Sequence, residues 1–166
     1  MGKLDKQDDL GRIIDVYQDR LFRFAFFRIG SLADSQDIVQ NVFLKMYEDR
    51  FDISKIDNLK NYLFRCISNS CSNYLRKKKT HSSVSLDSIV VKTAEEDIDE
   101  SAKEYERIAK MMESIPEEQA EVIRMRTIDS LAFTEIADIL DIPVTTVKSR
   151  FKYGVDKLKS KTNKIK

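Results

Sequence analysis

The chain has 166 residues, of which 42% are hydrophobic and 34% charged, so it can form one domain or two small ones with packed cores. Its formal net charge of +1 conceals segregation, because residues 80–113 carry nine acidic and four basic residues while the flanking segments are mildly basic. The N-terminal residues have acids where a signal peptide needs an apolar run, and no span is long enough to cross a bilayer, so we expect a cytoplasmic protein without membrane insertion.

Helical periodicity dominates the chain and no strand alternation competes with it, which predicts an all-α fold. Three helices are expected at residues 9–29, at residues 31–50 and at residues 59–79, with Gly30 ending the first. Ser31 and Asp34 have the spacing of a capping box at the start of the second. The apolar positions of that second helix are Ile38, Val39, Val42, Phe43, Met46 and Tyr47. Together the three helices predict an N-terminal domain of residues 1–79.

Residues 80–99 lack apolar periodicity, and they gather serines before an acidic run, so they predict a flexible acidic linker. His81, the only histidine, is expected to be a solvated residue of this linker. Cys66 and Cys71 are five positions apart in one helical pattern, a spacing that forbids an unstrained disulfide. We expect both cysteines to be small buried residues in a reducing compartment.

A C-terminal domain is predicted at residues 100–166, with one helix at residues 100–114 and another opened by Pro116. Residues 130–150, SLAFTEIADILDIPVTTVKSR, then have the pattern of a helix-turn-helix. Asp141 occupies the turn position that usually requires a left-handed backbone. The small Ala137 would let the two helices cross closely, while Val147 would fill their shared core.

Basic residues are concentrated in the second helix of this motif and beyond it. From residue 143 to the C-terminus there are eight basic residues and one acidic residue, whereas residues 114–142 have two and seven. A polyanionic partner such as DNA explains this segregation. The side chains expected to face DNA are Thr145, Thr146, Lys148, Ser149, Arg150 and Lys152, because Val144, Val147 and Phe151 must face inward. An amphipathic hairpin with a solvated basic tail is the alternative.

Residues 34–43, D-S-Q-D-I-V-Q-N-V-F, resemble the polymerase-binding helix of one bacterial family. This family is the extracytoplasmic-function (ECF) group of small, two-domain sigma factors. The resemblance implies that core RNA polymerase is a partner of this helix. The implied contact residues are Asp34, Asp37, Gln40 and Phe43. For Val39 and Phe43, a place in the hydrophobic core remains the alternative.

Residues 69–76, N-S-C-S-N-Y-L-R, resemble the family's N-x-x-x-D-x-x-R at the end of the promoter-melting helix, with Asn73 in place of aspartate. The resemblance implies that the third helix binds the separated strand of the minus-ten element. The implied residues are Tyr62, Arg65, Asn69, Asn73, Arg76, Lys77 and Lys78. Basic residues among an aromatic ring and amides suit a strand-binding surface. The basic run at residues 76–79 would also suit a solvated helix end.

Two further segments complete the resemblance: I-P-E-E-Q at residues 115–119 and T-V-K-S-R at residues 146–150 resemble the family's reader of the minus-thirty-five element. Where the family continues with two more arginines, this chain has the segment Tyr153-Gly154-Val155-Asp156. The resemblance also implies an anti-sigma partner, and it implies that the acidic linker lies in the RNA-exit path of the polymerase. A solvated connector would have the same composition.

We therefore expect a factor that binds core RNA polymerase, recognises promoter DNA and directs transcription initiation. The alternative is a helix-turn-helix regulator that acts on duplex DNA without polymerase. An enzyme is poorly supported, because the sequence lacks metal-ligand spacing of cysteine and histidine and lacks a glycine-rich phosphate loop. No catalytic residue, metal or cofactor is expected.

Overall fold

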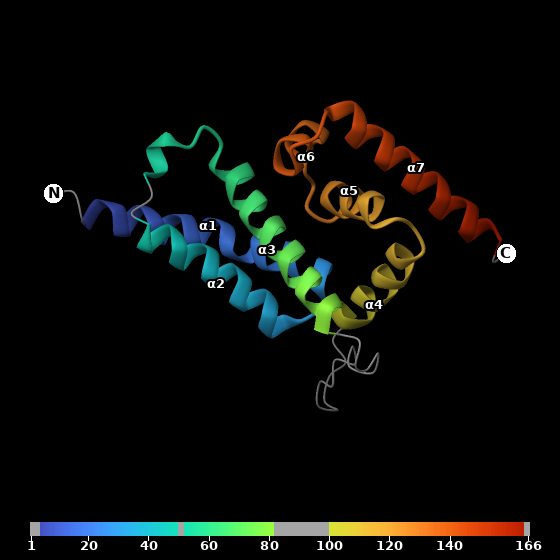
Figure 1. The fold of residues 1–166 in the computed structure, drawn as a ribbon, viewed down its shortest axis with the longest axis horizontal. Coiled ribbons are helices and arrows are strands. Elements are labelled where there is room, and N and C mark those ends of the chain that lie inside the picture. The colour runs from blue at the N-terminus through green and yellow to red at the C-terminus, as the bar shows by residue number, and fades with distance from the viewer. Residues whose placement is uncertain (1–3, 50–51, 82–99, 165–166) are drawn as a thin grey trace. The chain divides into compact units, whose positions relative to one another are not determined.

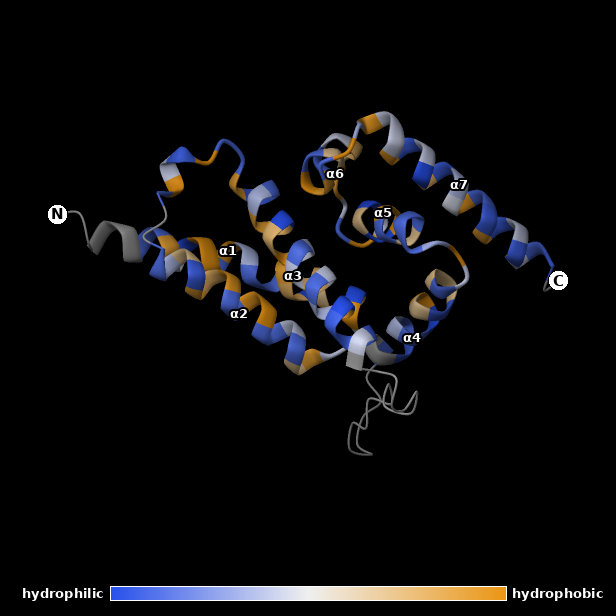
Figure 2. Cartoon of the chain, in the orientation of Figure 1, coloured by the Kyte–Doolittle hydropathy of each residue, from blue (hydrophilic) through white to orange (hydrophobic). Residues whose placement is uncertain are grey.

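The computed structural model describes residues 4–49, 52–81 and 100–164, and the chain divides into two compact units, Met1–Val84 and Ser85–Lys166 (Figure 1). The secondary structure within the described residues consists of helices without strands, as the periodicity predicted. Hydrophobic and hydrophilic residues alternate along the helices, so that each helix has an apolar face to bury (Figure 2).

The first unit is built from α1 (Leu4–Ile29), α2 (Leu32–Glu48) and α3 (Leu59–His81), with a short 3₁₀ turn, η1 (Ile53–Lys55), before α3. Each of the three long helices packs against the other two. The large side chains without solvent exposure include Leu21, Leu63, Phe64, Ile67 and Cys71. Among the aromatic rings, Phe24 of α1 meets Phe64 of α3 edge to face at 5.2 Å.

The junction of α1 and α2 follows the predicted pattern. Gly30 has φ 76°, a left-handed conformation that glycine adopts without strain, and its N–H bonds to Phe26 at 2.8 Å. The Ser31 hydroxyl then accepts the backbone N–H of Asp34 at 3.2 Å. The Asp34 carboxylate, however, accepts a bond from the distant Tyr74 hydroxyl. The expected capping box is therefore present in its serine half, while Asp34 joins α2 to α3.

The second unit contains α4 (Glu100–Glu113), α5 (Glu117–Thr127), α6 (Phe133–Leu140) and α7 (Val144–Asn163). One cluster of its core lies between α4, α5 and α7, where Met112, Ile115, Ala120 and Ile123 pack against Ile108, Phe151, Val155 and Leu158. Gly154 of α7 allows α5 and α7 to approach closely. A Cβ atom there would lie 2.7 Å from Ile123 Cδ1 and 3.1 Å from Gln119 Cβ.

Helices α6 and α7 form the predicted helix-turn-helix. Asp141 has φ 54° and ψ 51°, which confirms the left-handed turn residue, and Pro143 directly precedes α7. The Ile142 N–H bonds back to the Ala137 carbonyl at 3.1 Å, which closes the end of α6. Val147 has no solvent exposure, as predicted for the shared core, and Ala137 is also buried.

Several expectations require correction. Helix α1 begins five residues before the predicted start, and α3 continues through Thr80 and His81, so His81 belongs to a helix end rather than to a loop. Residues 82–99, the rest of the predicted linker, lie outside the described residues. Tyr47 is 54% exposed and does not join the core. Cys71 is buried as expected, whereas Cys66 is only half-buried, and both are free thiols.

Candidate functional site

Helix α2 separates the four predicted polymerase-binding residues into two kinds. Asp37 and Gln40 are exposed. Phe43 is 6% exposed and lies in the core with Val39, so in this structure it packs α2 against the other helices of the unit. Asp34 is half-buried and accepts a hydrogen bond from Tyr74 at 2.7 Å. Asp37 and Gln40 are therefore the two predicted residues that α2 presents to a partner.

Two exposed apolar residues that were not predicted to bind polymerase extend this surface. Leu44 is 52% exposed and Tyr47 is 54% exposed. They follow Asp37 and Gln40 at steps of four and three residues, so the four positions share one face of α2. We call Asp37, Gln40, Leu44 and Tyr47 the α2 stripe. A polar half next to an apolar half is the composition expected of a protein-binding surface.

Tyr74 connects this helix to α3. Its hydroxyl donates to Asp34, and burial together with this bond raises the pKa of Tyr74 to about 12. On the same side of α3, the Lys78 ammonium lies 5.9 Å from the centre of the Tyr74 ring, a cation–π distance. The link therefore joins α2 to the basic end of α3.

We expect Tyr74→Phe to destabilise the first unit by about 1–2 kcal/mol, because Asp34 loses its donor. Since the pKa of Tyr74 is raised on folding, its stabilisation is complete below pH 10 and disappears as pH rises from about 10 to about 12. Urea unfolding at pH 7 and along this pH range measures both effects. Tyr17→Phe, which removes the same hydroxyl from α1, is the matched control. An equal loss in the two variants would contradict the role of the Asp34 bond.

Most residues predicted to bind the minus-ten strand share one face of α3. Tyr62, Arg65, Asn69, Asn73 and Arg76 follow at steps of three or four residues, a spacing that aligns them along the helix. The two asparagines and Arg76 are exposed, while Tyr62 and Arg65 are half-buried. Lys77 is exposed beside this row. The structure therefore presents a continuous polar and basic surface along α3.

Tyr62 is half-buried, and Lys78 lies apart from the row of predicted residues. Burial, and after it a hydrogen bond with Cys66, raises the pKa of Tyr62 to about 12. Burial also raises the pKa of the Cys66 thiol. Lys78 lies over Tyr74, away from the row that begins at Tyr62.

Behind this face, Arg28 fixes α1 to α3, a contact that no sequence pattern indicated. Its Nη1 donates to the Ser68 hydroxyl at 3.1 Å and to the Ser68 carbonyl at 3.3 Å. Its Nη2 donates to the Ser72 hydroxyl at 2.9 Å. A single guanidinium thus spans one turn of α3 and restrains the helix that carries the predicted strand-binding residues.

In the second unit, the residues predicted to face DNA lie along the outer side of α7. Thr145, Lys148, Ser149 and Lys152 are exposed, while Thr146 is half-buried. Val147 is fully buried, and Val144 and Phe151 are half-buried, in agreement with their predicted inward position. Arg150 is also half-buried, and its Nη2 lies 3.6 Å from Glu118 Oε2 of α5.

Two arginines of α5 make contacts of different kinds. Arg124 is 8% exposed and forms an ion pair with Glu117 of the same helix, which compensates the buried charge. Arg126 donates to the Leu131 carbonyl at 3.1 Å, and its guanidinium lies 4.9 Å from the centre of the Phe133 ring. The contacts of Arg126 hold the start of α6 and thereby the orientation of the helix pair.

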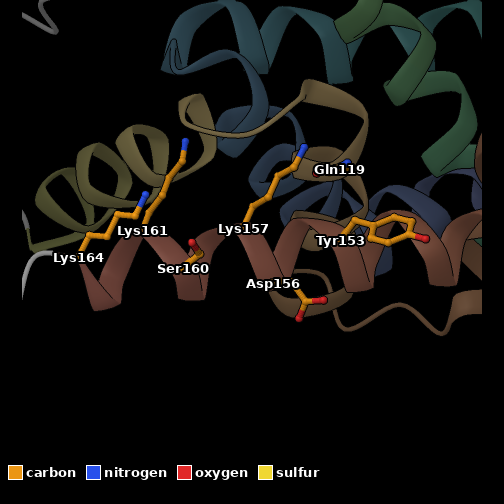
Figure 3. A pocket seen from close by; sticks show the side chains of 7 residues that line it. All are labelled: Gln119, Tyr153, Asp156, Lys157, Ser160, Lys161 and Lys164. Carbon is orange, nitrogen blue, oxygen red and sulfur yellow. The ribbon is translucent and has the colours of Figure 1, made fainter.

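Two shallow grooves run where α5 meets the outer side of α7. The larger, of about 590 Å³, is lined by Gln119, Tyr153, Asp156, Lys157, Ser160, Lys161 and Lys164 (Figure 3). Asp156 points away from the three lysines. The smaller, of about 290 Å³, shares Gln119 and Tyr153 with the first. Both grooves lie on the basic segment identified from the sequence.

The described residues contain no cluster of histidine, cysteine, aspartate or glutamate that could hold a metal ion. In the same part of the chain, no helix is both long and apolar enough to cross a membrane. The predicted site residues that the structure exposes lie on the α2 stripe, the polar face of α3 and the outer side of α7.

Two family models match these units in order. The model of sigma-70 region 2 matches residues 13–81, and the model of sigma-70 region 4 matches residues 105–158. The first match contains α2 and α3, and the second contains α5, α6 and most of α7. Both matches fall on the segments whose motifs resembled the ECF group.

Curated relatives agree with the family models. The chain is 28% identical over 175 aligned positions to the ECF RNA polymerase sigma factor SigW of Bacillus subtilis, covering 95% of this chain and 90% of the relative. It is 29% identical over 130 positions to the ECF RNA polymerase sigma-E factor of Escherichia coli strain K12, covering 71% of this chain and 68% of the relative.

Solved structures share the fold. CnrH in complex with the cytosolic domain of CnrY matches with a TM-score of 0.71 at 20% identity, covering 95% of this chain and 89% of that one. The sigma factor RpoE of Bartonella quintana, in complex with the anti-sigma factor NepR, matches with a TM-score of 0.68 at 20% identity, covering 92% and 95%.

Proposed function

Because this chain belongs to the ECF group of sigma-70 factors, we propose that it binds core RNA polymerase and directs the enzyme to initiate at promoter DNA. The observation that carries the proposal is the presence of both sigma regions, in order, on two units that each expose a surface suited to its task. The first unit presents the α2 stripe and the polar face of α3, and the second presents the basic outer side of α7.

We assign polymerase binding and the minus-ten element to residues 1–79, an acidic linker to residues 80–99 and the minus-thirty-five element to residues 100–166. Helix α4 begins at Glu100, which supports the second boundary, while α3 ends at His81, two residues inside the assigned linker. Asp37 and Gln40 would face polymerase, the α3 row from Tyr62 to Arg76 would contact the separated strand, and the exposed side of α7 would enter the major groove of the upstream duplex.

The proposal includes three further statements. The chain acts as a specificity subunit and performs no chemistry of its own. It works in the cytoplasm, where polymerase and promoter DNA are located. An anti-sigma protein is a further partner, supported by the two structural neighbours, each of which is a complex of a similarly folded chain with another protein.

An in vitro transcription assay with purified core RNA polymerase tests the function. A library of promoter fragments is transcribed by core enzyme alone and by core enzyme with the chain. We expect defined start sites that require the chain. Sequence-specific binding of the chain to duplex DNA without chain-dependent initiation would instead favour a helix-turn-helix regulator.

Within α7, base recognition and phosphate contact should separate along the helix. We expect Lys148→Ala or Ser149→Ala to relax the preference at particular bases of the upstream element, since one good base contact discriminates by about 1–3 kcal/mol. Lys157→Ala and Lys159→Ala should weaken binding to all DNA sequences alike and reduce the dependence of affinity on salt. Selection of randomised upstream DNA by the polymerase complex of each variant makes the comparison. Unchanged base preference in both former variants would show that another face reads the DNA.

A further inference from the structure

Beside the exposed face of α7 lies the smaller groove, which we call the Arg150 recess. It has a volume of about 290 Å³, and it is lined by Gln119, Thr145, Thr146, Ser149, Arg150 and Tyr153. Four of these side chains carry a hydroxyl group, one carries an amide and one carries a guanidinium. The Thr145, Thr146 and Tyr153 hydroxyls around the Arg150 guanidinium can donate hydrogen bonds to several oxygens of one anion, while Ser149 at the rim stays the predicted base contact.

Arg150 lies on a different side of α7 from Lys148. An α-helix turns by about 100° per residue, so the side chains of residues two positions apart, such as Lys148 and Arg150, point in directions about 200° apart. Lys148 and Lys152, four positions apart, share one side, while Arg150 points toward α5 and its Glu118. The two cations of the T-V-K-S-R segment therefore cannot both approach base edges in one groove.

The pairing of Arg150 with Glu118 is weak enough to be exchanged. The Nη2–Oε2 distance of 3.6 Å exceeds a good hydrogen bond, and the Glu118 side chain is 74% exposed. Exposed ion pairs of this kind contribute little and are screened by salt. A phosphate that enters the recess would offer Arg150 a bidentate partner with better geometry.

We propose that the Arg150 recess binds one backbone phosphate of the upstream promoter duplex, with Arg150 exchanging its Glu118 partner for that phosphate. This inference rests on the proposed promoter-binding function and deepens it. When a helix lies in the major groove, its exposed face points toward the base edges, and a phosphate backbone runs along each of its two sides. Arg150, on the α5 flank, is thus a phosphate ligand, while Lys148 stays the candidate for a base contact.

The test uses the full chain assembled with core polymerase and a promoter selected by the unmodified complex. Single neutral methylphosphonate linkages are placed at successive positions of the upstream element, and affinity is measured for each. We expect one linkage to weaken the unmodified complex by about three- to tenfold, as loss of one phosphate contact does. Arg150→Ala should weaken binding to natural DNA to the same extent and should then be insensitive to that linkage.

Lys159→Ala is the matched control, because it also removes one cation from α7 but lies outside the recess. The Lys159→Ala complex should still lose affinity when the neutral linkage is placed at the phosphate assigned to Arg150. Base preference, selected from randomised DNA, should stay unchanged in Arg150→Ala. An altered base preference in Arg150→Ala would overturn the phosphate assignment. The same holds if the affinity lost by Arg150→Ala adds to the affinity lost at every methylphosphonate linkage. Neither result would contradict promoter binding. Failure of the unmodified complex to use any promoter would instead overturn the proposed function itself, and the recess assignment with it.

Glu118 gives a second, independent measurement. Glu118→Gln should strengthen binding about two- to fivefold, since Arg150 no longer has a competing carboxylate. The same change should have little effect when Arg150 is already alanine. Asp156→Asn removes an equal charge from an exposed residue of α7 that points away from the lysines, and it should act equally in both backgrounds (Figure 3). Equal strengthening by Glu118→Gln in both backgrounds would rule out the exchange.

Discussion

Simultaneous replacement of Asp37 and Gln40 by alanine is expected to weaken binding of core RNA polymerase by about tenfold to a hundredfold, as the loss of a central interface pair does. Both side chains are exposed on α2, so the free energy of unfolding should change by no more than about 0.5 kcal/mol. The carboxylate and the amide would face basic and polar groups of the partner, and their loss leaves those groups unpaired in the interface.

Titration of labelled chain with core polymerase measures the affinity, and urea unfolding verifies the fold. The double variant Gln18→Ala with Asp19→Ala is the matched control, because it removes one amide and one carboxylate from exposed positions of α1. Unchanged affinity in a folded Asp37 and Gln40 variant would refute the role of the α2 stripe.

The apolar half of the stripe can be tested in the same assay. Leu44 and Tyr47 are about half exposed and lie on the same face of α2 as Asp37 and Gln40, where a partner could cover them. Changing both to glutamine should weaken polymerase binding while leaving the unfolding free energy nearly unchanged. Loss of stability without loss of affinity would indicate that they belong to the packing of the first unit instead.

Val147→Asp is expected to unfold the second unit while the first remains folded. Val147 has no solvent exposure, and burial of an unpaired carboxylate costs several kcal/mol, a large share of the stability of a small domain. Recognition of the upstream promoter element should then be lost, whereas polymerase binding through the α2 stripe should persist. This result would separate the tasks of the two units.

Amide hydrogen exchange of the two units, together with polymerase titration and promoter binding, decides the outcome. Thr145→Asp is the matched control, because it places the same charge two residues away at an exposed position. The control should weaken DNA binding and preserve the exchange protection of the second unit. Loss of protection in both units of Val147→Asp would show that they unfold together.

Much of the fold could be predicted from the sequence because its determinants are local. The helical period predicted the three helices of the first unit, and Gly30 and Asp141 marked backbone positions that the structure confirms as left-handed. The spacing of Val147 and Ala137 placed both in the core of the helix-turn-helix, where both are buried. Such features depend on residues within one or two turns of each other, so a pattern in the chain is sufficient to find them.

Contacts between residues far apart in the chain were decided only by the tertiary structure. Tyr74 and Asp34 are 40 positions apart, as are Arg28 and Ser68, and no periodicity relates them. Tyr47 fits the apolar period of α2 but lies at the edge of its buried face, where only the position of the neighbouring helices leaves it exposed. Arg150 looked equivalent to Lys148 in sequence, and the packing of α5 against α7 brought it to Glu118. Local periodicity determines which residues share a helix face, whereas the docking of one helix on another determines which of those faces meets solvent or a partner.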